Sequence, residues 1–374
     1  MKPVHRIIVL RFRRVGDAVL STVICSSLRK TFPDATIDYV LNVEIAPLFE
    51  NHPDIDHIIS FTKDEMANWI TYLQKVRCIM SSGKYDLIVD IRATVKTLLF
   101  SLFSLQTPYR IGWKKVYNLF LQNYRPAEPN HGDRLSRLLY LLHPLENYFK
   151  ILYKRDFTLY ITPEEQSAFR VKMENAGVDF SKPMVICAVA TRIPHKVWNE
   201  ERMRQVLERI IEHYDAQLIF NFADQTEEAV AVQLRNRMDN HPHVFTNVRA
   251  DNLRDLAAMI SLSNFFFGNE GGSRHISQAL KIPSFAIYPP TINKYEWLPG
   301  ANDRYQGIEP ADISEEKAKN PKLSFTSKFD LLTVDNVWEK LNPMLENAFQ
   351  SSSIEFSLSK ISCENSDLNY STVN

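Results

Sequence analysis

Short runs of apolar, often β-branched residues alternate along this chain with longer segments in which apolar residues recur at helical spacing. The short runs predict strands, and the longer segments predict helices. In the first half the predicted strands are residues 6–12, 36–42, 57–61, 85–92 and 109–113. The predicted helices of this half are residues 18–31, 65–80, 94–104 and 134–142. This alternation predicts a parallel sheet that is covered by helices on both faces.

The alternation begins again after an irregular stretch near residue 150. The second set of predicted strands comprises residues 183–190, 216–223, 243–249, 264–269 and 283–289. The second set of predicted helices comprises residues 165–176, 200–213, 226–238, 253–262 and 273–280, and another amphipathic helix is expected from about Asp335. We therefore predict an α/β protein with two Rossmann-like, doubly wound domains, 1–160 and 161–349, facing a central cleft at the carboxyl ends of their strands. The Ser- and Asn-rich residues 350–374 are predicted to form a mobile polar tail.

Composition narrows the class of partner. The 374 residues are 45% hydrophobic, and 44 Lys and Arg balance 44 Asp and Glu, so no net field attracts nucleic acid. The four cysteines are far apart and lack C-x-x-C spacing, which favours free thiols over disulfides or a zinc site. The chain opens almost directly on a strand without a signal-peptide pattern, and its most apolar helical run, Thr97 to Leu105, is far shorter than the ~20 residues of a membrane span. We expect a cytoplasmic protein.

The first strand ends in a basic turn that carries one carboxylate. The candidate residues of this turn are Arg11, Arg13, Arg14, Gly16 and Asp17. A dinucleotide-binding fold has a glycine-rich phosphate turn at this place, and an acid there would repel a diphosphate. Asp17 is therefore either a helix N-cap or a general base that faces the cleft. The arginines either hold an anionic substrate or belong to a solvated turn.

The loop after the first strand of the second half carries two cations, Arg192 and Lys196. A Lys or Arg at the carboxyl end of a strand compensates the charge of a bound diphosphate. We expect both side chains to meet the phosphates of a ligand, and the alternative is a charged surface loop. Trp198 is expected to pack this loop against the core.

A glycine-rich turn follows a buried strand later in the chain. Gly271 and Gly272 belong to a five-residue stretch with three of the chain's 10 glycines, directly before a helix whose first turn holds Ser273 and His275. Paired glycines let backbone amides approach a ligand, and the amino end of a helix favours anions. The pattern predicts a diphosphate cradle in which Glu270 accepts hydrogen bonds from sugar hydroxyls. A tight strand-to-helix turn is the alternative.

These segments together resemble glycosyltransferase family 9, the ADP-heptose:lipopolysaccharide heptosyltransferases. The resemblance rests on "RIIVLRFRRVGDAVLSTVICSSLRKTFPDATIDYVLN", "YDLIVDIRA", "HGDRLSRLL", "HKVWNEERM" and "FFFGNEGGSRHISQALKIPSFAIYPPT", which stand in the family's order between residues 6 and 291. Its most specific feature is that the opening Gly-Asp turn and the late glycine-rich turn with its histidine occur together.

The resemblance implies a GT-B architecture and an inverting, metal-independent transfer of heptose from ADP-heptose to a lipopolysaccharide core or related glycolipid, without a cofactor. Residues 1–160 would bind the lipid-linked saccharide acceptor and residues 161–349 the nucleotide-sugar. Asp17 would be the catalytic base. The implied acceptor-binding residues are Arg11, Arg13, Arg14 and Gly16. The implied donor-binding residues are Arg192, Lys196, Glu270, Gly271, Gly272, Ser273 and His275.

The late turn also departs from the family, which commonly has Asp-Thr-Gly-Pro-x-His where this chain has Glu270 to His275. The longer acid and the missing threonine hydroxyl lie where the family recognises the sugar and phosphates of the donor. A donor with a different sugar or nucleotide therefore stays open. Two other functions stay open too. One is a nucleotide-sugar epimerase or isomerase on the same plan, and the other is a non-catalytic sugar-nucleotide-binding relative.

A lipid-linked acceptor would bring the protein to the cytoplasmic face of the inner membrane as a peripheral protein. The segment with Arg110, Lys114 and Lys115, together with the apolar run Leu98 to Leu105, is a candidate for contact with an acidic glycolipid surface. Solvated charge and ordinary core explain these residues equally well.

Overall fold

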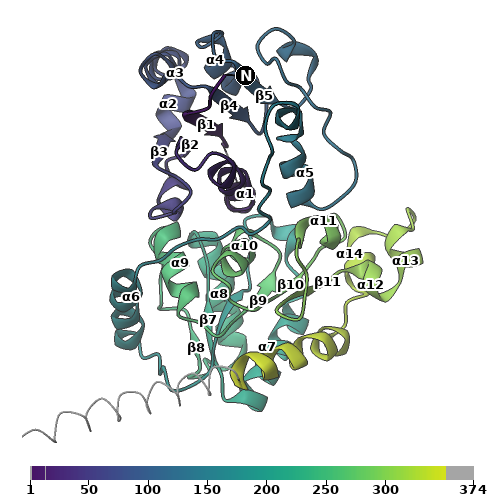
Figure 1. The fold of residues 1–374 in the computed structure, drawn as a ribbon. Coiled ribbons are helices and arrows are strands. Elements are labelled where there is room, and N and C mark those ends of the chain that lie inside the picture. Colours follow the sequence, from purple (N-terminus) through teal and green to yellow (C-terminus); the bar gives the residue numbers. More distant parts are fainter. Residues whose placement is uncertain (1, 13, 351–374) are drawn as a thin grey trace, which may run out of the picture.

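Two parallel sheets in two stacked lobes make up the computed structural model, which describes residues 2–12 and 14–350 (Figure 1). The first sheet has the order β3-β2-β1-β4-β5 and the second the order β11-β10-β9-β6-β7-β8. The first contains β1 (Arg6–Leu10), β2 (Thr36–Asn42), β3 (His57–Phe61), β4 (Leu87–Asp90) and β5 (Tyr109–Gly112). The second contains β6 (Met184–Ala188), β7 (Gln217–Phe220), β8 (Val244–Phe245), β9 (Phe265–Asn269), β10 (Ser284–Ile287) and β11 (Tyr305–Ile308). The predicted α/β class with two doubly wound units is confirmed.

The strand register brings the candidate loops to one edge of each sheet. In the first sheet, Leu10 at the end of β1 pairs with Val40 and with Asp90 at the end of β4. In the second sheet, Ala188 at the end of β6 pairs with Gly268 of β9. Because parallel strands all end at the same edge, the loops that follow β1 and β4 lie together, as do those that follow β6 and β9.

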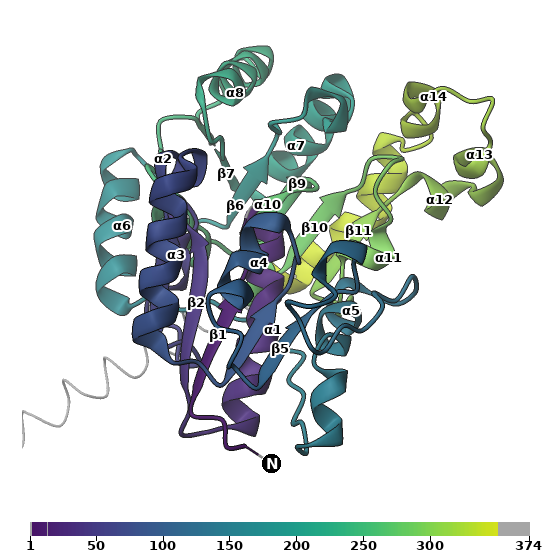
Figure 2. The ribbon, with the colours of Figure 1, turned by 90° about the horizontal axis from the view of Figure 1, so that it is seen from above.

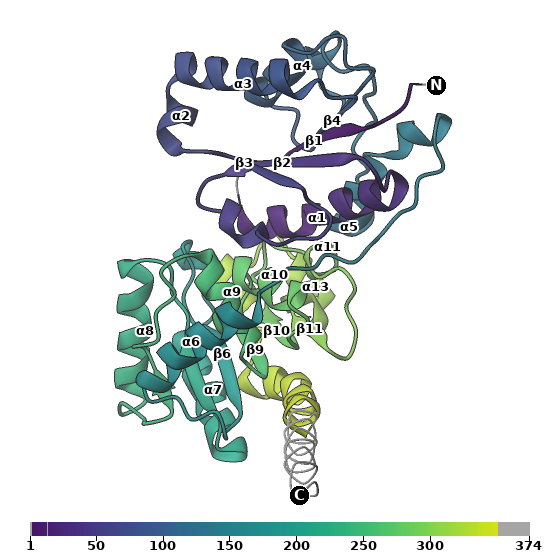
Figure 3. The same cartoon turned by 60° about the vertical axis from the view of Figure 1, so that its left-hand side comes forward.

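Helices cover both faces of the first sheet. Figure 3 shows α3 and α4 on the outer face, whereas α1 and α5 lie on the face toward the second lobe. The helices of this lobe are α1 (Val15–Thr31), α2 (Lys63–Ala67), α3 (Trp69–Gly83), α4 (Val95–Leu102) and α5 (Arg134–Tyr140), with 3₁₀ turns η1 (Ala46–Phe49), η2 (Val116–Asn118) and η3 (His143–Asn147). Leu98 and Phe100 of α4 are buried, as the core-helix interpretation of this apolar run expected.

The single helix predicted over residues 65–80 is wrong, because two helices occupy this segment. Asn68 ends α2 and starts α3, and its side-chain oxygen accepts hydrogen bonds from the amides of Ile70 and Thr71 at 3.0 and 3.2 Å. An asparagine that satisfies these two amides stabilises a new helix start. The apolar periodicity continues across the break and conceals it.

The second lobe holds the remaining helices. They are α6 (Pro163–Asn175), α7 (Glu200–Tyr214), η4 (Pro194–Lys196), α8 (Gln225–Arg237), α9 (Leu253–Ser261), α10 (Gly272–Ala279), α11 (Lys294–Trp297), α12 (Pro310–Ile313), α13 (Glu315–Lys319) and α14 (Phe325–Phe329). Figure 2 shows α12, α13 and α14 together at one side of the molecule. We did not predict β11 or α11 to α14, since segments of four or five residues are too short to show a periodicity.

The helix expected from about Asp335 is present. Residues 334–350 are helical, and Val337, Leu341 and Leu345 are buried in a core cluster that also contains Val206 and Ile210 of α7. The proposed division at residue 160 leaves one sheet on each side. The predicted tail lies outside the described residues apart from Gln350. Within residues 2–12 and 14–350, no helix combines the length and the apolar character needed to cross a bilayer.

The two lobes pack against each other through a shared hydrophobic core, in addition to being connected by the chain that runs between them. One buried cluster contains Val19 and Val23 of α1 together with Ile276 and Ala279 of α10. Burial of apolar side chains on both sides of this contact stabilises the arrangement of the lobes, at about 1.5–3 kcal/mol for each fully buried large side chain. The amino ends of α1 and α10 therefore meet in a defined geometry.

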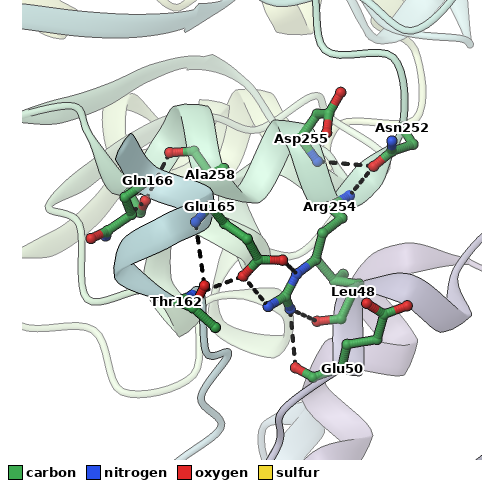
Figure 4. Close-up of polar contacts among 10 residues, drawn as sticks. Leu48, Glu50, Thr162, Glu165, Gln166, Asn252, Arg254, Asp255 and Ala258 are labelled. Atoms are coloured by element: carbon green, nitrogen blue, oxygen red, sulfur yellow. Dashed lines mark hydrogen bonds and ion pairs between the residues drawn. The ribbon is translucent and has the colours of Figure 1, made fainter. Parts of the chain in front are cut away.

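Arg254 of α9 adds a polar anchor between the lobes (Figure 4). Its guanidinium donates to both carboxylate oxygens of Glu165 in α6, from Nε at 2.7 Å and from Nη2 at 2.6 Å. Its Nη1 reaches the first lobe and donates to the carbonyl oxygens of Glu50 at 3.1 Å and Leu48 at 3.5 Å. One buried side chain thus connects α6 and α9 to the end of η1.

Candidate active site

Asp17 lies in the first turn of α1 and has an exposed fraction of only 8%. Its Oδ1 atom is 2.5 Å from Nη2 of Arg11 and 3.2 Å from Nη2 of Arg134. The N-cap of α1 is Arg14, so the alternative in which Asp17 caps the helix does not describe this turn. The carboxylate is held instead between two cations, one from the end of β1 and one from α5.

The basic turn supplies one buried and one exposed arginine. Arg11 has an exposed fraction of 3%, and this burial lowers the pKa of its guanidinium, while the adjacent Asp17 carboxylate acts in the opposite direction. Arg14 is exposed and has a φ of 46°, in the region that non-glycine residues rarely adopt. Arg13 lies outside the described residues.

A cavity of about 450 Å³ opens next to this turn, at the carboxyl ends of β1, β4 and β5. Among the described residues, its charged lining side chains are Arg11, Arg14, Asp17, Arg92, Lys115, Glu128 and Arg134. Cations outnumber carboxylates in this lining. Its aromatic lining side chains are Trp113 of the first lobe and Trp297 of the second. Asp17 thus faces a cationic cavity of the first lobe, to which the second lobe contributes Trp297; none of the predicted donor-binding residues, all within the described part of the chain, lines it.

In the second lobe, the structure brings Lys196 and Glu270 together. Nζ of Lys196 is 3.6 Å from Oε2 of Glu270, whose exposed fraction is 8%. Arg192 is exposed and interacts electrostatically with Glu227 of α8. Lys196 therefore lies at the glycine-rich turn, whereas Arg192 lies toward α8. Trp198 is buried, as expected.

The glycine-rich turn packs against the opening turn of the first lobe. A Cβ added at Gly16 would lie 2.5 Å from Cδ2 of His275, and one added at Gly272 would lie 3.2 Å from Cβ of Val15. Gly271 has an extended φ of 178°, and a Cβ there would meet no atom of the described residues within 4 Å. The backbone at Gly271 is thus open, while Gly16 and Gly272 allow the two helix ends to touch.

Ser273 and His275 have different surroundings in the first turn of α10. The Ser273 hydroxyl accepts a hydrogen bond from Nδ2 of Asn221 at 3.1 Å. His275 is buried, and desolvation together with the neighbouring Arg274 guanidinium lowers its pKa well below the ordinary value. Its imidazole is therefore neutral at physiological pH. Its ring packs on Gly16, so His275 lies at the contact between the lobes.

Sequence reasoning missed Arg134 and Trp297, which complete the surroundings of Asp17. The guanidinium carbon of Arg134 is 5.4 Å from the centre of the Trp297 ring, and that ring centre is 6.1 Å from the centre of the His275 ring. Nearby, Arg137 of α5 forms an ion pair with Glu296 of α11. Arg134 stands in the quoted "HGDRLSRLL" motif, which was the one available signal. Nothing in the sequence around Trp297 indicated its position.

Asn269 was also missed, although it ends the strand before the glycine-rich turn. Its Nδ2 donates to the carbonyl oxygens of Ala188 and Val189 at 3.0 and 3.1 Å, and its Oδ1 accepts from the amide of Trp198 at 2.8 Å. These bonds hold the loop with Lys196 against the end of β9. A buried amide at the carboxyl end of a strand was the signal that could have identified it.

Comparison with known proteins now assigns the class. The two lobes and the solved relatives show a GT-B fold, and the family match makes the chain a glycosyltransferase. It belongs to glycosyltransferase family 9 (heptosyltransferase), whose sequence pattern matches residues 74–323. The resemblance found in the sequence is thereby confirmed, although the matched region begins after Asp17. Proposals about Asp17 therefore depend on geometry.

Individual relatives are distant in sequence but similar in length and fold. Lipopolysaccharide heptosyltransferase 3 of Escherichia coli is 23% identical over 302 residues, which cover 78% of this chain and 85% of that protein. The glycosyl transferase family 9 structure from Veillonella parvula DSM 2008 has a TM-score of 0.78 at 18% identity, covering 93% and 99% of the two chains. E. coli ADP-heptose lps heptosyltransferase II has a TM-score of 0.71 at 18% identity, covering 91% and 99%.

Proposed function

We propose that this protein is an inverting, metal-independent heptosyltransferase that moves heptose from ADP-heptose to a lipopolysaccharide core or related glycolipid. The observation that carries the proposal is the position of Asp17 in the wall of a cationic cavity, directly beside the contact between α1 and the glycine-rich turn. Family membership favours transfer over the epimerase and the non-catalytic alternatives. The donor and acceptor are suggested by the names of the relatives, lipopolysaccharide heptosyltransferase 3 and ADP-heptose lps heptosyltransferase II.

The first lobe would activate the acceptor. An acceptor hydroxyl in the cavity gives its proton to Asp17 as its oxygen attacks the anomeric carbon of the donor. Because Arg11 and Arg134 both hold Oδ1, we assign the proton transfer to Oδ2. The two guanidinium groups fix the orientation of the carboxylate, which lowers the entropic cost of reaching the transition state. The arginine-rich lining is suited to an anionic saccharide.

The second lobe would bind the donor and stabilise its leaving group. As the new glycosidic bond forms, the bond between the anomeric carbon and the diphosphate oxygen breaks, and the configuration inverts. Negative charge grows on the diphosphate, where Lys196 and the open backbone at Gly271 can meet it. Glu270, Gly272 and Ser273 complete the proposed donor turn, with Arg192 at its edge. Lys196 would exchange its contact with Glu270 for the phosphates.

Product analysis tests this function. The purified protein is incubated with ADP-heptose and a heptose-deficient lipopolysaccharide acceptor, and the acceptor is examined by mass spectrometry and NMR. We expect one added heptose of inverted anomeric configuration, at a rate that EDTA leaves unchanged. Other nucleotide-sugars, tested in parallel, show whether Glu270 in place of the family's usual aspartate changes which donor is used. An acceptor that stays unmodified with every donor would contradict the proposal.

We further propose that the reaction takes place at the cytoplasmic face of the inner membrane, with the protein bound peripherally. This location follows from the proposed lipid-linked acceptor.

A further inference from the structure

Residues 116–120, in and after η2, expose an unusual amount of apolar surface. Val116 has an exposed fraction of 97% and Phe120 one of 85%, and more than half of Tyr117 and Leu119 is exposed as well. Single exposed apolar side chains are common, but adjacent ones on a soluble protein typically mark an interaction surface.

Hydrogen bonds on the inner side hold this segment in place. Asn118 is buried, and its Nδ2 donates to the carbonyl oxygen of Trp113 at 2.8 Å and to Oε1 of Gln122 at 2.6 Å. Nε2 of Gln122 in turn donates to Oδ2 of the buried Asp90 at 3.2 Å. Because the buried Asn118 side chain is bonded inside the protein, Val116 and Phe120 on either side of it are presented outward by a defined backbone.

The residues directly before this segment line the cavity next to Asp17. Trp113 and Lys115 line that cavity, and Val116 follows them directly. A partner that covers residues 116–120 would therefore lie beside the proposed acceptor site.

The charge of this region identifies the kind of partner. The chain as a whole has no net charge, yet the stretch from Ile91 to Ala127 contains no aspartate or glutamate. Its cations are Arg92, Lys96, Arg110, Lys114, Lys115 and Arg125. Lys114 and Lys115 are exposed and adjoin Val116. Exposed lysines beside exposed apolar side chains match an anionic lipid surface, which offers charge and an apolar interior together.

The structure separates the exposed from the inward-facing residues of the expected membrane contact. The guanidinium of Arg110 donates to the carbonyl oxygens of Leu121 at 2.8 Å and Leu105 at 2.6 Å, so this side chain supports the local backbone. In the apolar run from Leu98 to Leu105, Leu98 and Phe100 are core residues, whereas Leu102 and Leu105 are exposed at 44% and 52%. The surface next to the cavity is formed by residues 114–120.

We propose that residues 114–120 form a docking surface for an anionic bilayer. Val116, Leu119 and Phe120 enter the boundary between headgroups and acyl chains, and Lys114 and Lys115 meet lipid phosphates. The proposal rests on the proposed function, since a lipid-anchored acceptor would then present its saccharide to the cavity beside Asp17.

Vesicle flotation tests the docking surface without any acceptor present. The full chain is mixed with phosphatidylglycerol/phosphatidylethanolamine vesicles or with phosphatidylcholine vesicles. We expect binding to the anionic vesicles alone, and a loss of about tenfold or more in the V116S/F120S variant. The V171S/V232S variant, which removes exposed valines from α6 and α8, serves as the matched control and should bind as the wild type does.

The other results are equally decisive. Equal flotation of V116S/F120S and wild type, or no binding of wild type to anionic vesicles, overturns the proposal. Self-association in analytical ultracentrifugation that V116S/F120S abolishes also overturns it, because a second copy would then cover the surface.

Transfer to a deacylated, water-soluble acceptor separates this proposal from the proposed function. V116S/F120S should keep wild-type turnover there, whereas vesicle binding without transfer to any acceptor would contradict the proposed function alone.

Discussion

The Asp17 carboxylate is held by two guanidinium groups, one close to it in the chain and one distant. Arg11 is six residues away, and Arg134 is separated from Asp17 by 117 positions. Both contacts use Oδ1, so they fix the rotation of the carboxylate as well as its position. Asp17 and Arg11 are therefore coupled, and a change at one alters the other.

Asp17→Asn is expected to lower turnover by about 10²-fold or more, because the proposed general base is lost. It should also lower the melting temperature, since the buried Arg11 loses its ionic partner, a change that costs about 3–5 kcal/mol in comparable buried pairs. Affinity for ADP should stay near that of wild type. Thermal unfolding measures the melting temperature, and initial rates and calorimetric ADP titrations below it measure the other two effects.

Asp251→Asn is a matched control, because Asp251 pairs with Lys172 on the surface. We expect nearly wild-type turnover and stability from it. Near-normal turnover of Asp17→Asn itself would remove Asp17 from the mechanism.

Lys196→Ala is expected to weaken ADP binding about tenfold or more, since a hydrogen bond to a charged group contributes roughly 1.5–3 kcal/mol. Acceptor affinity should change little. Isothermal titration calorimetry measures both, with Lys172→Ala on α6 as a lysine-to-alanine control. Unchanged ADP affinity would favour the alternative in which Arg192 and Lys196 belong to a charged surface loop.

Two helix ends from different lobes meet at Gly16, where α1 packs against α10. The His275 ring occupies the space that a side chain at position 16 would need. The opening Gly-Asp turn therefore has a packing role for its glycine in addition to the proposed catalytic role of its aspartate. This contact also brings the proposed catalytic turn of one lobe next to the proposed donor turn of the other.

Gly16→Ala is expected to lower the melting temperature, because its Cβ would force the buried His275 ring to move and overpacking of this kind typically costs about 1–3 kcal/mol. Differential scanning calorimetry measures the effect. Gly271→Ala is the control for stability, since its Cβ would enter open space at an extended φ. Equal melting temperatures for Gly16→Ala and wild type would show that the two helices do not need this close approach.

The two lobes are joined through a common apolar core and through the Arg254 anchor. The Arg254 guanidinium, followed by the Thr162 amide, holds the pKa of Glu165 down to about 2. A carboxyl group whose pKa is lowered on folding adds stability above its unfolded pKa, and this stability is lost as the pH falls toward the folded value. The anchor therefore loses strength below about pH 4.5.

Arg254→Met is expected to lower the unfolding free energy at pH 7 by about 2 kcal/mol, from the lost charged hydrogen bonds. The difference from wild type should shrink as the pH falls below about 4.5, because wild type then loses the same interaction. Urea unfolding at several pH values measures this. Arg170→Met, which removes an exposed pair with Glu174 on α6, should have little effect at any pH. A difference that stays constant with pH would contradict the role of Glu165.

Local pattern determined most of the elements and the class of fold. Alternating strand and helix patterns led to two parallel sheets, and the helix after residue 334 followed from its apolar spacing. The basic turn with Asp17 and the glycine-rich turn were found because chain order places them directly after strands. These features depend on residues that are close together in the chain, so they can be predicted from the sequence.

Tertiary structure alone decided which distant side chains meet. Arg134 contacts Asp17, Trp297 lines the cavity, and His275 packs on Gly16, because α1, α5, α10 and α11 meet where the lobes pack. The periodicity of a helix shows which of its faces is buried, but it does not show which other helix covers that face. The elements were therefore predictable from the sequence, whereas the surroundings of the candidate base depended on how the two lobes pack together.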